Sequence, residues 1–345
     1  MVIFAALKMG WVLAVMWFLT AITLLFVILR LYTKVCIIGA TEWTNLWRLY
    51  HVSRGSFHLV LERLHDKYGP VVRIGPNVVD VDAPEAVKTV FNTKGDWKKT
   101  EVGSKLPVVY NLFSQTDPQK HAAEKRPIAK YYSMNGVQPL EPHMDTVIKE
   151  LCHQLETRFM DGPDAKGTCA LGQWILFYTW DVVGKVTFSQ TIGYLGHGRD
   201  FDGTLGVAEQ ALDYFSWVGC IPVLDHFLAK NPYIKGLGPP GLGNIGAMSV
   251  QRLVARYQGL DKDTHDPEQA DFLDKFIDAK NANPGTVDDA QIVSWLMINL
   301  IAGADTTAIS IRSTIYFSLR NPRIWRRLRD ELAAAGLTKD SSDTN

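Results

Sequence analysis

The segment from residue 286 to residue 320 constrains the fold most, because it predicts one long helix. It opens with TVDD, in which Thr286 is the expected N-cap and the two aspartates suit the positive end of the helix dipole. Asn321 and Pro322 end it and open a further helix, NPRIWRRLRDEL. The residues between are among the most apolar of the chain, so the long helix is predicted to be buried.

The centre of this helix carries residues that a buried helix ordinarily avoids. Gly303 costs about 1 kcal/mol relative to alanine in a helix interior, and the carboxylate of Asp305 has to be paired or hydrated. The glycine lets another group approach the backbone. Thr306 is expected to bond to the carbonyl of Ala302 and to distort the helix there, and Asp305 could relay protons through water. From the residues alone, incidental polar side chains at a packing position explain the pattern equally well.

The N-terminus predicts a membrane anchor. No charged side chain interrupts the run from Met9 to Leu29, which has the length of a transmembrane helix. Lys8 precedes the run and Arg30 and Lys34 follow it, which favours a body in the cytosol. A cleaved signal peptide is the alternative, but its apolar region should have only about 7–15 residues.

The composition excludes several functions. The chain has 345 residues with 36 basic and 36 acidic side chains, so nothing indicates a nucleic-acid partner. The cysteines lie far apart without CxxC spacing, so neither a zinc site nor a redox motif is predicted. A glycine tract over residues 236 to 246 contains two GxGxxG matches, but no strand precedes them and prolines interrupt the first. It is predicted to be a flexible connector and not a nucleotide site.

One small β element is predicted. Two β-branched runs, residues 71 to 74 and 78 to 81, flank Gly75, Pro76 and Asn77 and indicate a hairpin with a three-residue turn. The remaining body has the apolar spacing of helices, so the fold is predicted to be mainly α with this hairpin.

A basic cluster lies in DPQKHAAEKRP. His121 and Lys125 share one helical face, with Arg126 adjacent. Charge clusters are usually solvated, so the residues alone favour an ordinary surface. A receptor for an anionic group such as a carboxylate is the second interpretation.

The residues AGADTT, 302 to 307, resemble the oxygen-binding motif [AG]-G-x-[DE]-T-[TS] of the cytochrome P-450 monooxygenases. In that family the motif lies over the haem on the longest helix. The resemblance implies that Ala302 and Gly303 adjoin the haem and that the glycine makes room for dioxygen. It also implies that Asp305 and Thr306 help to deliver protons for cleavage of the O–O bond.

Other segments resemble the same family. The anchor is similar to that of microsomal members. KYGPVVRIGPNVVDVDAPEAVKTVF is similar to the first hairpin and the following helix of fungal members, including those similar to pisatin demethylase. DPQKHAAEKRP resembles the helix that binds a haem propionate, which implies this role for His121, Lys125 and Arg126. The resemblance covers nearly the whole chain.

The departures from the family concern the haem ligand. The chain contains neither E-x-x-R nor F-x-x-G-x-x-x-C-x-G, and none of its four cysteines, Cys36, Cys152, Cys169 and Cys220, can be assigned as the thiolate. The resemblance corresponds to about the first two thirds of a family member. We therefore expect a chain truncated before the haem-ligand region, which forms no haem-thiolate centre by itself. The alternative is a non-catalytic membrane-anchored fragment or a decayed copy, acting at most as an interaction protein.

These observations predict an anchor over residues 1–35 and a cytochrome P-450-like domain over residues 36–345. The fold expected is the N-terminal portion of the cytochrome P-450 fold behind one transmembrane helix. By resemblance, the function is haem-thiolate monooxygenation of an apolar small molecule in secondary metabolism, with electrons from an NADPH-cytochrome reductase. The resemblance also implies the membrane of the endoplasmic reticulum and a cytosolic body, and no metal-ligating residue is assigned in this chain.

Overall fold

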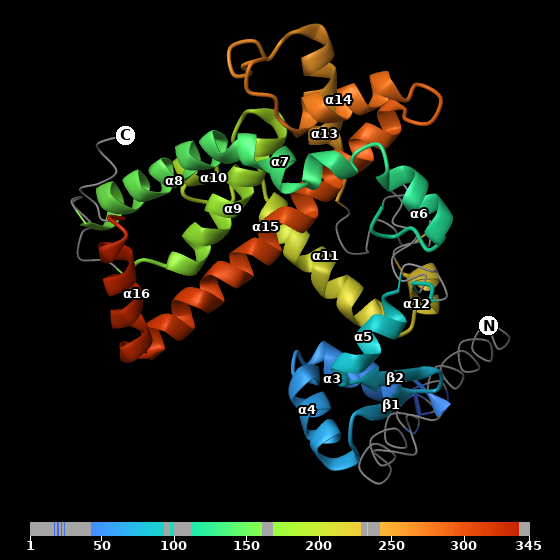
Figure 1. The fold of residues 1–345 in the computed structure, drawn as a ribbon. Coiled ribbons are helices and arrows are strands. Elements are labelled where there is room, and N and C mark those ends of the chain that lie inside the picture. Colours follow the sequence, from blue (N-terminus) through green and yellow to red (C-terminus); the bar gives the residue numbers. More distant parts are fainter. Residues whose placement is uncertain are drawn as a thin grey trace, which may run out of the picture. The chain divides into compact units, whose positions relative to one another are not determined.

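The structure is a computed structural model, and its described residues are mainly helical (Figure 1). They are residues 17, 19–20, 22, 24, 43–92, 97–99, 112–160, 168–228, 233 and 242–337. The chain divides into two compact units. The first contains residues 1–103 and 212–239, and the second contains residues 104–211 and 240–345.

The first unit contains the predicted β-hairpin. Its described elements are α3 (Leu46–Ser53), α4 (Phe57–Tyr68), β1 (Val71–Gly75), β2 (Val78–Val81), α5 (Pro84–Val90) and α12 (Val223–Phe227). The strands are antiparallel, and Gly75 pairs with Val78. The hairpin is confirmed with one difference, because Gly75 belongs to β1 and only Pro76 and Asn77 form the turn.

Helices α3 and α4 cover one face of the hairpin. Alternation along β1 turns Val72 and Ile74 toward the interior, where they meet Trp47 of α3. His65 ties α4 to the strands, with Nδ1 2.9 Å from the carbonyl oxygen of Gly69 and Nε2 2.8 Å from Oδ2 of Asp80. The Asp80 hydrogen bond, followed by the Gly69 carbonyl, raises the pKa of His65.

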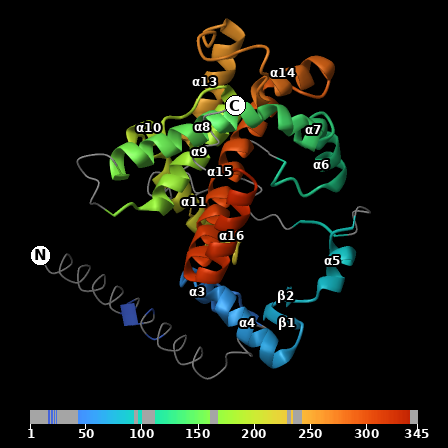
Figure 2. The same cartoon turned by 60° about the vertical axis from the view of Figure 1, so that its left-hand side comes forward.

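The second unit consists of helices in its described part. They are α6 (Pro118–Lys125), η1 (Ala129–Tyr132), α7 (Met134–Val137), η2 (Gln138–Leu140), α8 (Glu141–Leu155), η3 (Glu156–Met160), α9 (Leu171–Phe188), α10 (Tyr194–His197), α13 (Gly243–Gln258), α14 (Phe272–Ala282), α15 (Asp289–Arg320) and α16 (Pro322–Ala334). Helix α11 (Thr204–Val218) includes residues of both units. Figures 1 and 2 both show α9 running beside α15, with α8 along α9.

Helix α15 is the core helix of this unit. Residues at four-residue spacing along it are fully buried, namely Ile292, Leu296, Leu300, Ala304 and Ala308. A buried leucine or isoleucine contributes about 1.5–3 kcal/mol of stability. The row ends in two alanines, so α9 can lie close to the second half of α15.

The beginning of α15 differs from the prediction. The helix starts at Asp289, and the carboxylate of Asp288 accepts a hydrogen bond from the backbone N–H of Gln291 at 2.8 Å. Thr286 was therefore the wrong N-cap, because its hydroxyl instead donates to the carbonyl of Asn283 in the preceding turn, at 3.4 Å. The predicted end is confirmed, since α15 stops at Arg320.

The prediction of a flexible connector is wrong for the last residues of the glycine tract. Helix α13 begins at Gly243, so residues 243–246 are helical, and residues 234–241 lie outside the described residues.

The predicted anchor, residues 9–29, lies almost entirely outside the described residues. Its five described positions are helical with exposed side chains: Trp17, Leu19, Thr20, Ile22 and Leu24. Among the described residues only α15 has the length and hydropathy to cross a membrane, and it is the core helix of the second unit. Membrane anchoring and the boundary between residues 35 and 36 remain predictions.

Candidate active site on α15

Thr306 bonds to its own helix as predicted. Its Oγ1 donates to the carbonyl oxygen of Ala302 at 2.7 Å. The predicted distortion is wrong, because the α-helical pattern continues through this turn and the hydroxyl bond accompanies the backbone bonds. The side chains of Ala302 and Thr306 are both exposed. They form an open face of α15, on which the hydroxyl oxygen can still accept a hydrogen bond.

Asp305 points toward the packed side of the helix. The indole Nε1 of Trp180 on α9 donates to its Oδ1 at 3.2 Å, and the carboxyl group is half-buried. Burial raises the pKa of Asp305, although the Trp180 hydrogen bond and the positive charge of Arg312 act in the opposite direction. Successive helical residues lie about 100° apart. The Asp305 carboxyl group therefore lies at the border of the packed face of α15, and the Thr306 hydroxyl lies next to it on the open face.

Gly303 serves the contact between α15 and α9. A Cβ atom at this position would lie 3.0 Å from Cγ2 of Val183. The expectation that the glycine admits another group is confirmed, but the group is a side chain of α9. That the glycine makes room for dioxygen, as the family resemblance implies, stays a prediction.

The basic cluster lies on α6, which begins with a well-formed cap. Asp117 accepts hydrogen bonds from the backbone N–H groups of the first turn. His121 is half-buried, while Lys125 and Arg126 are exposed. Neither of these two cations forms an ion pair within the described part of the chain. Their charges therefore remain available for an external anion.

The structure does not bring the α6 cations into contact with the α15 pair. It does connect the segment after α6 to α15, through the hydroxyl of Tyr132, which donates to Oδ1 of Asn299 at 2.5 Å. Asn299 lies one helical turn before Gly303. Its buried Nδ2 has no partner among the described residues. Sequence periodicity could not predict this contact, because the two residues are far apart in the chain.

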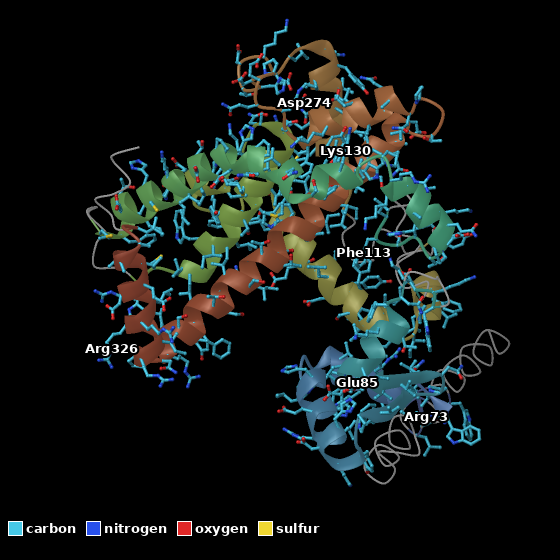
Figure 3. The ribbon with its side chains drawn as sticks, viewed as in Figure 1. Arg73, Glu85, Phe113, Lys130, Asp274 and Arg326 are labelled. Carbon is cyan, nitrogen blue, oxygen red and sulfur yellow. The ribbon has the colours of Figure 1, made fainter. Side chains whose placement is uncertain are left out.

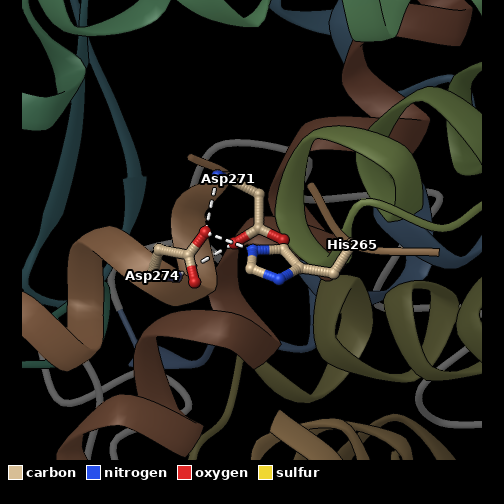
Figure 4. A group of neighbouring side chains, drawn as sticks. All are labelled: His265, Asp271 and Asp274. Atoms are coloured by element: carbon tan, nitrogen blue, oxygen red, sulfur yellow. Dashed lines mark hydrogen bonds and ion pairs between the residues drawn. The ribbon is translucent and has the colours of Figure 1, made fainter. Parts of the chain in front are cut away.

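A second polar cluster was missed by the sequence analysis. His265, Asp271 and Asp274 place one ligand-type atom each within 4.8 Å of one another (Figure 4). His265 Nε2 lies 2.8 Å from Oδ2 of Asp274. Asp271 caps α14, accepting from the N–H of Asp274 at 2.9 Å, and Asp274, which is labelled in Figure 3, is the third residue of that helix.

The guanidinium of Arg256 already pairs with the two carboxylates of this cluster. Its Nη2 lies 2.8 Å from Asp271, its Nε lies 2.5 Å from Asp261, and its Nη1 contacts Asp274. Ser189, whose φ of 58° is unusual for a side chain other than glycine, donates to Asp271 at 2.8 Å. A metal ion would have to displace the guanidinium. The arrangement is therefore better explained as an ion-pair network that joins α9, α13 and α14.

The described cysteines differ in environment. Cys152 is exposed, Cys169 is half-buried and Cys220 is buried. Burial raises the pKa of Cys169, which disfavours its thiolate form. Cys36 lies outside the described residues.

Comparison with known proteins gives a consistent result. The family model described as cytochrome P450 matches residues 39–343. The cytochrome P450 monooxygenase cfoH of Aspergillus candidus is 39% identical over 302 residues, which cover 86% of this chain and 56% of that protein. A cytochrome P450 monooxygenase of Aspergillus terreus is 32% identical over 356 residues, covering 98% and 70%. The monooxygenase pkfB of Emericella nidulans is 33% identical over 325 residues, covering 90% and 62%. The chain thus spans a little over half the length of the first of these relatives.

Proposed function

Because this chain belongs to the cytochrome P450 family, we propose that it carries the proton-delivering part of a haem-thiolate monooxygenase. The observation that carries this proposal is the placement of two neighbouring polar side chains of α15 in different environments. Thr306 presents its hydroxyl on an open face, and the adjacent Asp305 holds a half-buried carboxyl group. The relatives named above are monooxygenases, which supports the reaction class. The substrate we propose is an apolar small molecule of secondary metabolism.

The donor set of the chain suits haem. When bound, haem supplies the iron at which dioxygen is activated. Lys125 and Arg126, with His121 on the same helix, provide cations for the propionate carboxylates. Ala302 supports the fit, because its side chain is small and exposed and so leaves room for a flat ring on the open face of α15.

Asp305 and Thr306 would transfer a proton one after the other. The raised pKa of Asp305 keeps more of its carboxyl protonated near neutral pH than an ordinary aspartate would allow, which suits a general acid. The Thr306 hydroxyl donates to the carbonyl of Ala302, so its oxygen can accept a hydrogen bond from a water molecule on the open face. A proton taken from solvent at Asp305 could then reach the open face next to Thr306.

The partners follow from the same proposal. We place the chain at the membrane of the endoplasmic reticulum through residues 9–29, with its body in the cytosol and an NADPH-cytochrome reductase as electron donor. Support comes from the uncharged N-terminal run and from the family.

Haem titration of the 345-residue chain tests the propionate site. The double variant Lys125→Ala/Arg126→Ala should bind ferric haem about tenfold more weakly, since a hydrogen bond to a charged group contributes about 1.5–3 kcal/mol before solvent screening. Lys120→Ala, on another face of α6, is the matched control and should bind like the parent chain. Equal affinities for all three proteins would refute the propionate assignment.

The reduced carbon monoxide difference spectrum of the reconstituted chain tests the ligand. The four cysteines lack the sequence context of the thiolate ligand, so the 345 residues alone should give no red-shifted thiolate Soret band. Such a band, if one cysteine substitution abolished it, would overturn this expectation and identify the ligand. No haem binding of any kind would favour the non-catalytic alternative.

A further inference from the structure

The partner of Asp305 is a residue that the sequence motif does not contain. Trp180 belongs to α9 and is 1% exposed. Its indole N–H donates to Oδ1 of Asp305 at 3.2 Å, and its ring packs edge-on against Tyr194 with centroids 6.2 Å apart. The indole therefore has little freedom to follow the carboxylate if Asp305 moves.

The neighbouring residue fixes this part of α9. The buried carboxylate of Asp181 accepts hydrogen bonds from the backbone N–H groups of Gly193, Tyr194 and Leu195, at 2.7, 3.2 and 2.9 Å. These bonds hold the loop and the short helix that follow α9 against the helix itself. Trp180 is thus presented to α15 from a constrained position.

Indole is a neutral donor, which matters for a carboxyl group that exchanges protons. An arginine or lysine in its place would hold Asp305 in the charged form. Among the described residues, Arg312 is the one cation whose charge lowers the pKa of Asp305. Its Nε already donates a hydrogen bond to the carbonyl of Gly172 at 2.6 Å. Oδ2 of Asp305 receives no hydrogen bond from a described residue.

We propose that Trp180 is a positioning residue for Asp305, with its indole N–H tying Oδ1 to α9 so that Oδ2 is the oxygen that gains and loses the proton. The catalytic meaning of this arrangement rests on the proposed function, but the hydrogen bond and its effect on Asp305 do not. Because the indole N–H stabilises the carboxylate, its removal should raise the pKa of Asp305 further.

Nuclear magnetic resonance of the full 345-residue chain in detergent tests this without haem. In protein labelled with ¹⁵N-tryptophan, the Trp180 indole signal is identified by its loss in Trp180→Phe. It should shift with pH, with a midpoint above the ordinary aspartate value of about 3.9. In Asp305→Asn the same signal should no longer respond. An indole signal that is insensitive to pH in the parent chain would overturn the proposal.

A second experiment measures the titration of the Asp305 carboxyl group directly, in protein labelled with ¹³C at the aspartate carboxyl carbons. Trp180→Phe should shift the Asp305 titration to higher pH. Trp174→Phe removes another buried tryptophan from α9 and should leave the titration unchanged. Equal shifts in both variants would show a general loosening of α9 and would contradict the positioning role. If these titrations come out as expected but the haem measurements described above fail, the proposed function is contradicted and the positioning role of Trp180 is not.

Discussion

Asp305 is the residue at which function and stability oppose each other. Its pKa is raised in the folded chain, so the charged form is disfavoured there relative to the unfolded chain. A group of this kind lowers stability at pH values above its ordinary pKa of about 3.9. The cost disappears as the pH falls and the carboxyl group becomes protonated in both states.

Asp305→Asn should therefore unfold at a higher urea concentration than the parent chain at pH 7. The amide oxygen can still accept the Trp180 hydrogen bond, and no charge remains to be buried. The difference should shrink as the pH is lowered toward 4.

Asp289→Asn is the control with the opposite sign. Hydrogen bonds from Lys280 and Tyr257 lower the pKa of Asp289, so the carboxylate stabilises the fold above its ordinary pKa. That variant should be slightly less stable at pH 7, by a few tenths of a kcal/mol for an exposed pair. Loss of stability at pH 7 in Asp305→Asn would contradict our description of the Asp305 environment.

At the scale of single elements, the beginning of α15 offers a direct comparison between two candidate caps. Asp288→Ala removes the side chain that accepts from Gln291 and should cost about 1 kcal/mol in the free energy of unfolding. Thr286→Ala should cost much less, because its hydroxyl caps nothing in α15. Urea unfolding measures both, and the reverse order would restore Thr286 as the cap.

The contact of α9 with α15 can be tested by a double-mutant cycle at Gly303 and Val183. Alanine is favoured over glycine in a helix interior by about 1 kcal/mol, but its Cβ would lie 3.0 Å from Val183. Gly303→Ala should thus be more favourable in the Val183→Ala background than in the parent chain. Additive effects of the two substitutions would show that the contact does not restrict residue 303.

Local sequence was sufficient for most elements but not for their contacts. The caps and apolar spacing predicted the hairpin and most of α15, and the AGADTT motif located Asp305 and Thr306. The choice of Asp288 over Thr286 depended on the turn at residues 283–287, which spacing does not reveal.

Trp180 lies 125 residues from Asp305 in sequence, so no helical periodicity could pair them. The same holds for Tyr132 with Asn299. The local distance rules that predict helices and hairpins do not reach contacts of this kind.

At the scale of the whole molecule, the membrane anchor is the first prediction. The 345-residue chain should remain in the membrane pellet after carbonate extraction, because residues 9–29 form an uncharged run long enough to span a bilayer. A variant that lacks residues 1–35 is the control and should be released. Intact chain in the supernatant would refute the anchor.

The central claim is that Asp305 and Thr306 transfer and direct protons beside a haem that this chain binds. It is tested most directly in a haem-loaded protein that contains these 345 residues, assayed with NADPH and the reductase. The measurement is the fraction of consumed dioxygen that leaves as hydrogen peroxide. Thr306→Ala should raise this fraction several-fold, since reduced dioxygen whose O–O bond is not cleaved takes its protons from bulk water and leaves as hydrogen peroxide. Thr307→Ala, the exposed neighbouring threonine, should leave the fraction unchanged. The same fraction in the parent protein and both variants would contradict the account.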